Sequence, residues 1–186
     1  MKNFILITLF VTLLLTSCSD TDYETRTVRV KGKYSIDIPK MLSKATDLNE
    51  DASLQYQNTF RELYVIVIDE SKREYENVIV DSYLEEAYGN NLNGYSKLVV
   101  EGIEREIVLD SLPKLKDITI NGMKAKTFAT TGEVDAVRGY WNITFIEGRN
   151  NYYQVMSWTL PDNIEKYEDI INDMRNSFKD TDKSKK

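Results

Sequence analysis

The chain of 186 residues has no histidine and a single cysteine. Without histidine, the sequence excludes a histidine general base, Ser-His and Cys-His nucleophilic pairs, and zinc sites that contain histidine. A single cysteine also excludes an internal disulfide. Because any catalysis would depend on carboxylates, lysine or tyrosine, we expect a protein that is not an enzyme and that holds no cofactor and no metal.

The sequence also lacks an apolar run long enough for a membrane-spanning helix, which needs about 20 residues. The run from Phe4 to Leu15 is shorter, follows Lys2 and leads into small residues, as in a secretory signal peptide. Its end, Leu15-Thr16-Ser17-Cys18, resembles the lipobox of bacterial lipoproteins. In that motif the cysteine is lipidated and the preceding peptide is removed. We therefore expect residues 1–17 to be a lipoprotein signal peptide and Cys18 to anchor the protein in a membrane.

The residues that follow the cysteine are polar and acidic, and we expect residues 18–26 to form a tether. The stretch Ser19 to Glu24 resembles the export signals that Bacteroidota place after the lipidated cysteine to send lipoproteins to the cell surface. A solvated linker explains the same residues equally well. The expected location is therefore the outer membrane, with the domain either facing the periplasm or exposed on the cell surface.

Basic residues are outnumbered by acidic ones. Removal of residues 1–17 takes away one lysine and no acid, which leaves 23 basic and 30 acidic side chains and a formal net charge of −7. Such a surface is a poor partner for nucleic acid. With three prolines and no low-complexity stretch, residues 27–179 are expected to form one domain. We predict that residues 180–186, which are polar and rich in lysine, form a disordered tail.

Alternation of apolar and polar residues predicts short strands at both ends of the domain. Two are expected at 27–30 and 34–38, joined by Lys31-Gly32-Lys33, and two more at 53–57 and 63–69. The segment 63–69, "LYVIVID", is apolar enough for a central strand covered on both faces. After Pro113 the pattern predicts strands at 118–120, 123–130, 137–146 and 152–160, with a tight turn at Asn121-Gly122.

Helical periodicity occupies the remaining segments. Apolar residues every three or four positions predict a helix over 78–89 that continues, with a kink, to about residue 101. A second helix is expected after Pro161-Asp162, with its apolar stripe ending at Phe178. Strands, a helix, further strands and a closing helix predict an α+β domain with a largely antiparallel sheet and helices packed on it.

Several of these segments also resemble the sequences of a known superfamily. "GKYSIDIPK", "INGMKAKTF", "RGYWNITFIEGRNNYYQVMSW" and "YEDIINDMRNSF" resemble the PsbP-like superfamily, which includes small bacterial lipoproteins. The resemblance covers residues 31–178 and carries no catalytic motif. It implies an α/β/α sandwich around an antiparallel sheet, and a role in binding or assembly. The long charged stretch from Glu101 to Lys116 has no counterpart in the resemblance.

Aromatic residues concentrate on the predicted hairpin 137–160. Alternation places Trp141, Ile143 and Phe145 on one face, which we interpret as core, and Tyr140 and Asn142 on the other. Tyrosine beside a side-chain amide suits a peptide or a sugar face. Cross-strand packing beneath a helix explains the same residues and is the favoured interpretation. The candidate ligand-binding residues are Tyr140, Asn142, Tyr152 and Tyr153.

Two acidic clusters contain residues that suit calcium binding or glycoside hydrolysis, but neither cluster matches its motif well. Residues 47–53 carry acids at the spacing of a calcium loop, but Ala52 replaces the required glycine and Asn58 replaces the bidentate glutamate. Asp69, Glu70, Glu74 and Glu76 follow the apolar strand, where paired carboxylates would suit glycoside hydrolysis. Acids at such a position are usually a hydrated turn into a helix.

Three hypotheses follow. The sequence favours a membrane-anchored lipoprotein whose domain is a non-catalytic binding or scaffold module of the cell envelope, with an envelope protein or glycan as its partner. The alternative is a carboxylate-dependent hydrolase of surface glycans, which requires two acids in one cleft. The third is a purely structural or antigenic surface protein without a small ligand.

Overall fold

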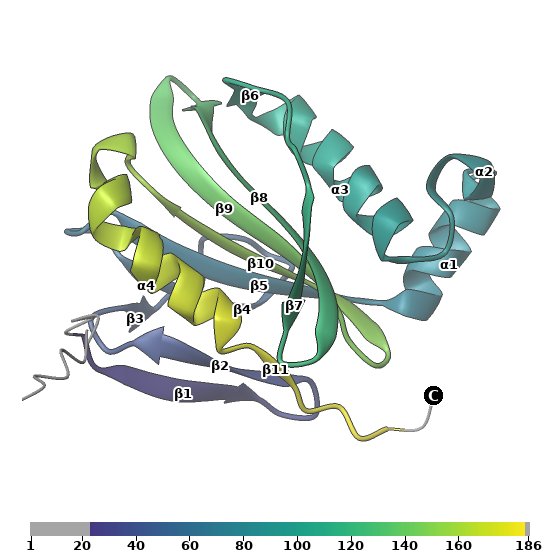
Figure 1. The fold of residues 1–186 in the computed structure, drawn as a ribbon, viewed down its shortest axis with the longest axis horizontal. Coiled ribbons are helices and arrows are strands. Elements are labelled where there is room, and N and C mark those ends of the chain that lie inside the picture. Colours follow the sequence, from purple (N-terminus) through teal and green to yellow (C-terminus); the bar gives the residue numbers. More distant parts are fainter. Residues whose placement is uncertain (1–22, 185–186) are drawn as a thin grey trace, which may run out of the picture.

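The computed structural model describes residues 23–184 of the chain. An eight-stranded sheet forms its centre, with the strands in the order β3-β4-β5-β10-β9-β8-β6 and with β7 also paired to β8 (Figure 1). All of its strand pairs are antiparallel. The strands are β3 (Ser43–Lys44), β4 (Ala52–Asn58), β5 (Leu63–Ser71), β6 (Val108–Leu109), β7 (Lys116–Ile120), β8 (Met123–Val134), β9 (Val137–Glu147) and β10 (Asn151–Thr159).

The strand β5 is the central strand that its apolar sequence predicts. It pairs with β4 on one side and β10 on the other. Leu63, Val65 and Val67 are fully buried towards one face, and Ile66 is buried towards the other. Both faces of the sheet are therefore covered at this point, which confirms the prediction.

A small second sheet and the last helix cover one face of the central sheet. The small sheet has the order β1-β2-β11, formed by β1 (Thr25–Val30), β2 (Tyr34–Pro39) and β11 (Lys179–Asp180). The helix α4 (Ile164–Asn176) follows a 3-10 turn at Pro161–Asn163 and packs on β2, β9 and β10. Beneath them, the ring centroid of Tyr34 lies 5.4 Å from that of Tyr153 and 4.9 Å from that of Phe178.

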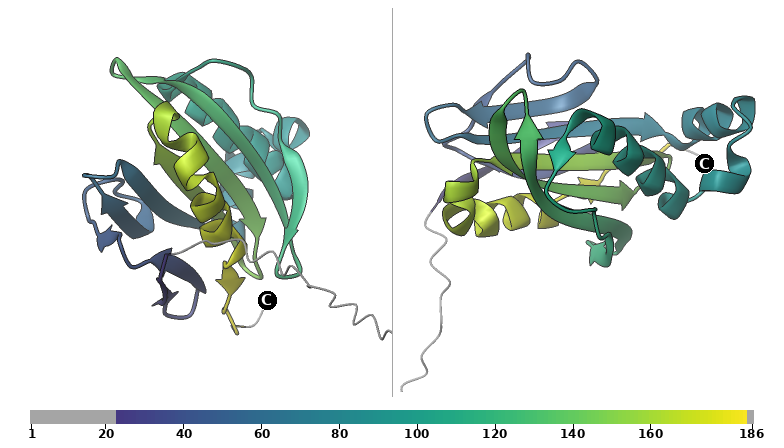
Figure 2. Two further views of the ribbon diagram at one scale, coloured as in Figure 1. Left: turned by 60° about the vertical axis from the view of Figure 1, so that its left-hand side comes forward. Right: turned by 90° about the horizontal axis from the view of Figure 1, so that it is seen from above.

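Three helices cover part of the opposite face. These are α1 (Lys72–Asp81), α2 (Glu85–Tyr88) and α3 (Leu92–Glu106), and α3 packs on β8 and β9. Their core contains Tyr95, Ile143, Phe145 and Tyr152. In Figure 2, α4 and the α1–α3 group lie on opposite sides of the sheet. The fold is thus an α/β/α sandwich of the α+β class with a largely antiparallel sheet, as predicted.

The middle helical region differs from the prediction. In place of one kinked helix over 78–101, α1 begins six residues earlier, at Lys72, and the region divides into three helices. Ser71 caps α1, since its side chain accepts a hydrogen bond from the Glu74 N–H. The left-handed backbone of Tyr83 and the positive φ of Gly89 then end two helices. Asn91 caps α3 in the same way as Ser71 caps α1.

The predicted tight turn at Asn121-Gly122 is confirmed, with both residues in the left-handed region between β7 and β8. The next hairpin is longer than predicted. β8 continues to Val134, and Asp135 and Ala136 form a two-residue turn, both with positive φ. Because neither residue is glycine, the sequence carries no strong signal for this turn.

The two ends of the described chain are attached to the domain. The Tyr23 hydroxyl donates a hydrogen bond of 2.8 Å to the Asp173 carboxylate of α4. β1 begins at Thr25, within the segment expected as tether. Of the expected tail, Asp180 lies in β11, and the Thr181 N–H donates to the Lys33 carbonyl at 2.9 Å. Within residues 23–184, no helix has both the length and the apolar character to cross a bilayer.

Candidate functional site

A cavity of about 380 Å³ lies beside α4, above β8 and β9, and we call it the α4 cavity. The volume is within the range of about 300–1,000 Å³ that is typical of small-molecule sites. Its floor is Thr127 and Asn142 of the sheet, and Ser111, Lys114 and Lys116 line it from the β6–β7 segment. Glu168, Asn172 and Arg175 of α4 complete the wall.

The cavity exists because β6 and β7 pair with different parts of the same edge strand. β6 pairs with Gly132 and Glu133 of β8, whereas β7 pairs with residues 123–127. The connecting segment 110–115 must therefore pass the middle of β8 without continuing either pairing. Pro113 in this segment has no N–H to donate, which suits a segment that does not pair as a strand.

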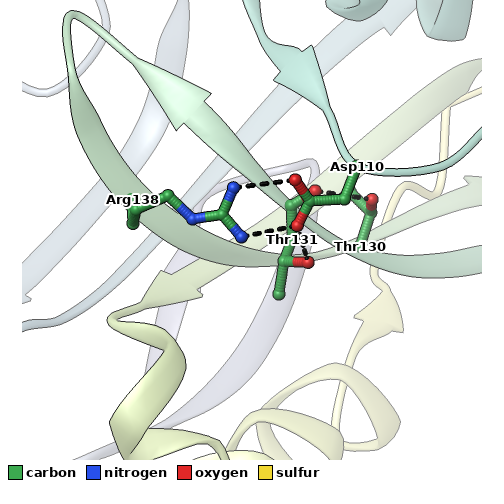
Figure 3. Close-up of polar contacts among 4 residues, drawn as sticks. All are labelled: Asp110, Thr130, Thr131 and Arg138. Atoms are coloured by element: carbon green, nitrogen blue, oxygen red, sulfur yellow. Dashed lines mark hydrogen bonds and ion pairs between the residues drawn. The ribbon is translucent and has the colours of Figure 1, made fainter.

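An ion pair fixes the start of this segment (Figure 3). The Arg138 guanidinium donates to both oxygens of Asp110, at 2.7 and 2.5 Å. The Thr131 hydroxyl donates to the same carboxylate, and the Asp110 N–H donates to the Thr131 carbonyl at 3.0 Å. These donors lower the pKa of Asp110 to about 2. The bidentate geometry holds the wall of the α4 cavity in one position.

The charge of the α4 cavity is opposite to that of the whole chain. Lys114, Lys116 and Arg175 line it against one acid, Glu168. Arg175 is half-buried, and burial lowers the pKa of its guanidinium, which nevertheless stays charged. None of the ion pairs in the described part of the chain includes Arg175. Its Nε donates to the side-chain oxygen of Asn176 at 3.2 Å.

A guanidinium that has lost part of its hydration gains from a charged acceptor. The side chains around it are polar groups that would complete the contacts of an oxyanion, namely the Asn142 and Asn172 amides and the Ser111 hydroxyl. The nearby Tyr140 hydroxyl is neutral at pH 7, since burial raises its pKa, an effect that the Asn142 amide partly offsets. The arrangement suits binding of a carboxylate or phosphate group.

The structure separates the four tyrosine and asparagine residues predicted to bind a ligand. Tyr140 and Asn142 face α4, and Asn142 borders the α4 cavity. Tyr153 faces the same side but is fully buried, with its hydroxyl donating to the Lys33 carbonyl at 3.2 Å. Tyr152 faces the opposite side, where its ring centroid lies 4.4 Å from that of Tyr95. Asn142 is thus the predicted ligand residue that reaches a surface cavity.

The acidic residues at the end of β5 and the start of α1 do not converge. Asp69 points to the small sheet, where its carboxylate lies 2.5 Å from the Lys33 ammonium group. Its neighbour Glu70 points to the other face and accepts hydrogen bonds from Tyr95 and from Gln154. Glu74 and Glu76 are exposed on α1. Adjacent residues of a strand point to opposite faces, so the pair is not arranged for hydrolysis across one bond.

The acidic loop 47–53 is organised by an uncharged side chain. The Gln55 carbonyl oxygen accepts hydrogen bonds from the Leu48 and Asn49 N–H groups at 2.8 and 3.1 Å, and its amide donates to the Asn49 carbonyl at 2.7 Å. Among residues 23–184, no group of three or more acids, histidines or cysteines is placed to hold a metal ion.

The cations of the α4 cavity were missed by the sequence analysis. Glu168, Asn172 and Arg175 recur at helical positions i, i+4 and i+7, so they form one polar stripe beside the apolar stripe of α4. That spacing is visible in the sequence. Lys114 and Lys116 carried no such pattern, because their position depends on how segment 110–115 crosses β8. Cys18 lies outside the described residues.

Neither a known protein family nor a curated protein sequence matches the chain. Solved structures do match. The cyanobacterial PsbP protein (CyanoP) of Synechocystis sp. PCC 6803 is 12% identical with a TM-score of 0.56, over 89% of this chain and 98% of that one. LpqN of Mycobacterium tuberculosis, involved in cell envelope biogenesis, is 8% identical with a TM-score of 0.51, over 87% and 93%.

A third solved structure, PA94 of Pseudomonas aeruginosa, has unknown function. It is 15% identical to this chain with a TM-score of 0.48, over 83% of this chain and 95% of that one. At sequence identities this low, the similarity to these structures shows a shared fold and no shared function. The match to CyanoP shows that the fold is PsbP-like.

Proposed function

We propose that the protein is a lipoprotein of the outer membrane, held there by lipidated Cys18, and that its domain is a non-catalytic module that binds an anionic group of an envelope ligand in the α4 cavity. The binding proposal rests on the environment of Arg175. Its half-buried guanidinium has no carboxylate partner among the described residues, and Lys114 and Lys116 lie at the same cavity. In a chain with a net charge of −6, this local excess of cations favours an anion.

The anchor and the location have separate support. The signal peptide pattern and the resemblance to a lipobox support lipidation at Cys18. A cysteine carrying several acyl chains holds a protein on a membrane stably. LpqN, which shares the fold, is involved in cell envelope biogenesis. This relationship supports an envelope role, and it leaves the choice of membrane face to experiment.

The anchor is tested by metabolic labelling with an acyl-chain analogue in a Bacteroidota host. We expect the wild-type protein to be labelled and to fractionate with outer membranes, and the Cys18→Ala variant to lose both properties. Protease treatment of intact cells then shows whether the domain faces outward. An unlabelled wild-type protein would disprove the anchor.

The cavity is tested by titrating the purified protein with glucuronate and with inorganic phosphate at low salt, using calorimetry. Arg175→Gln should weaken binding of the preferred anion by about ten- to a hundred-fold, because hydrogen bonds to charged groups contribute about 1.5–3 kcal/mol. Arg105→Gln, at an exposed position in the last turn of α3, is the matched control and should bind normally. Equal binding by both variants would contradict the proposed site.

A further inference from the structure

Aromatic side chains form a row on the other face of the sheet, at the end where β5 begins and β10 ends. The strand register places Trp141 opposite Trp158, and Trp158 opposite Tyr64. The three residues thus cross the neighbouring strands β9, β10 and β5, and each is partly exposed. We call this row the aromatic ledge.

The ledge borders a second cavity of about 380 Å³. Besides the three aromatic residues, Val137 and Leu160 supply apolar surface, Glu62 and Asp135 supply carboxylates, and Arg138, which is paired with Asp110, supplies a guanidinium. None of the residues that line it belongs to α1, α2 or α3, although Ile143 and Phe145, further along β9, are buried in the core under these helices. The helices therefore cover the middle of this face and leave its end open.

The indole of Trp141 lies flat along its own strand. A Cβ atom added to Gly139 would lie 2.5 Å from Cη2 and 2.8 Å from Cζ2 of this indole. Glycine at position 139 is therefore what permits the ring to rest on the backbone. One face of the indole is covered by the strand, and the opposite face is directed away from it. Because Trp141 is partly exposed and lines the cavity, this geometry suits stacking of a ligand on the outer face of the indole.

The other two rings are held parallel to each other. The centroids of Tyr64 and Trp158 are 5.2 Å apart, with an interplanar angle of 6°. The Tyr64 hydroxyl donates to the Glu62 carboxylate at 2.8 Å, and burial raises the pKa of Tyr64 to about 12, so the ring is neutral at pH 7. Glu62 adopts a left-handed backbone with φ of 51°, which is unusual for a non-glycine residue.

The position of the ledge argues for a sugar and against an extended peptide. An extended peptide that binds by strand addition needs an unpaired edge of a sheet. β5, β9 and β10 are each paired on both sides, so their backbone groups are not available to a peptide. A pyranose ring needs no backbone contact, since its C–H face packs on the electron-rich face of an aromatic ring and its hydroxyls reach nearby carboxylates.

We propose that the aromatic ledge binds an uncharged pyranose ring of a glycan, which stacks on Trp141 and Trp158 and donates a hydroxyl hydrogen bond to Glu62. This site is separate from the α4 cavity and uses none of its residues. The proposal therefore stands or falls independently of anion binding.

The two tryptophans of the ledge are the only ones in the chain, so tryptophan emission reports on this site alone. The full-length protein, in a detergent without a sugar headgroup, is titrated with cellobiose. Sorbitol, which has hydroxyls but no ring, is the matched control ligand. We expect a saturable change with cellobiose, with a dissociation constant of about 1 mM or lower, and none with sorbitol. The absence of a saturable change, or the same change with sorbitol, would overturn the proposal.

Variants separate stacking from folding. Trp141→Ala keeps Trp158 as the reporter and should bind cellobiose about three- to ten-fold more weakly, and Trp141→Phe should be intermediate. Gly139→Ala keeps both tryptophans but displaces the indole, so it should weaken binding as Trp141→Ala does. Tyr83→Ala, an exposed aromatic residue between α1 and α2, is the control. Unchanged affinity in folded Trp141→Ala and Gly139→Ala proteins would also overturn the proposal.

Discussion

The two candidate sites lie back to back on the same strand, and their chemistry is opposite. Asn142 of β9 borders the α4 cavity, where Arg175 and two lysines outnumber the single acid Glu168, while its neighbour Trp141 belongs to the aromatic ledge on the other face. Because strand residues alternate between faces, one segment supplies a polar floor to one site and a stacking surface to the other. In both cases a helix covers only part of its face.

The largest effect should come from the cores beneath the two faces. Phe178→Ala on the α4 side and Phe145→Ala on the α3 side each remove a fully buried ring, and each should lower the free energy of unfolding by about 3–5 kcal/mol. Since both cores share one sheet, we expect a single transition in each variant. Urea denaturation followed by far-UV circular dichroism and by tryptophan emission should give coincident curves. Separate transitions would show that the two faces fold independently.

The salt dependence of ligand binding should differ between the two sites. Raising the salt concentration from about 0.05 M to about 0.5 M shortens the screening length and should weaken anion binding several-fold. Cellobiose binding at the ledge should be unchanged, because stacking does not depend on net charge. Parallel titrations with the two ligands measure this contrast, and a common salt dependence would argue against two distinct chemistries.

The hairpin that joins β8 to β9 lines the cavity at the aromatic ledge, and its turn is not optimal. Ala136 has φ of 65°, where glycine is preferred. Ala136→Gly should raise the free energy of unfolding by about 1 kcal/mol, as measured by urea denaturation. Ala87→Gly in the helix α2 should lower it by about 0.5–1 kcal/mol. A loss of stability in Ala136→Gly would contradict the assigned backbone.

The smallest effect concerns the Asp110–Arg138 ion pair, which is exposed and lies between the two sites. Asp110 begins the segment that walls the α4 cavity, and Arg138 lines the cavity at the aromatic ledge. The pKa of Asp110 is lowered to about 2 from an ordinary value near 4. The stabilisation it gives is therefore complete above pH 4 and is lost as the pH falls through about 2. The difference in unfolding midpoint between wild type and Asp110→Asn should be constant from pH 5 to 7 and should shrink at lower pH. Asp47→Asn is an exposed control.

The predictable features were those with local causes. Asn121-Gly122 predicts its own hairpin, and the "LYVIVID" segment predicts a central strand, because turn chemistry and burial act over a few residues. The turn at Asp135-Ala136 was missed since neither residue signals it, and the division of the helical region depended on Tyr83 adopting a positive φ.

The sites were less predictable than the fold. Alternation correctly assigned Trp141 to the same face as Ile143 and Phe145, and that face was interpreted as core. The interpretation is right for Ile143 and Phe145 and incomplete for Trp141, because the sequence does not show where the cover of α3 ends. The α4 cavity likewise depends on the path of segment 110–115, a tertiary feature without a local pattern.

If Cys18 is lipidated as proposed, the hydrogen bond between Tyr23 and Asp173 limits how far the domain extends from the membrane. With Cys18 as the anchor, four residues lie between the lipidated cysteine and Tyr23, whose side chain is fixed to α4. Even when it is fully extended, this part of the tether spans at most about 18 Å. The domain would therefore stay close to the headgroup layer and would meet long glycans near their membrane-attached ends. A longer tether between Cys18 and Tyr23 would increase the distance of the domain from the membrane.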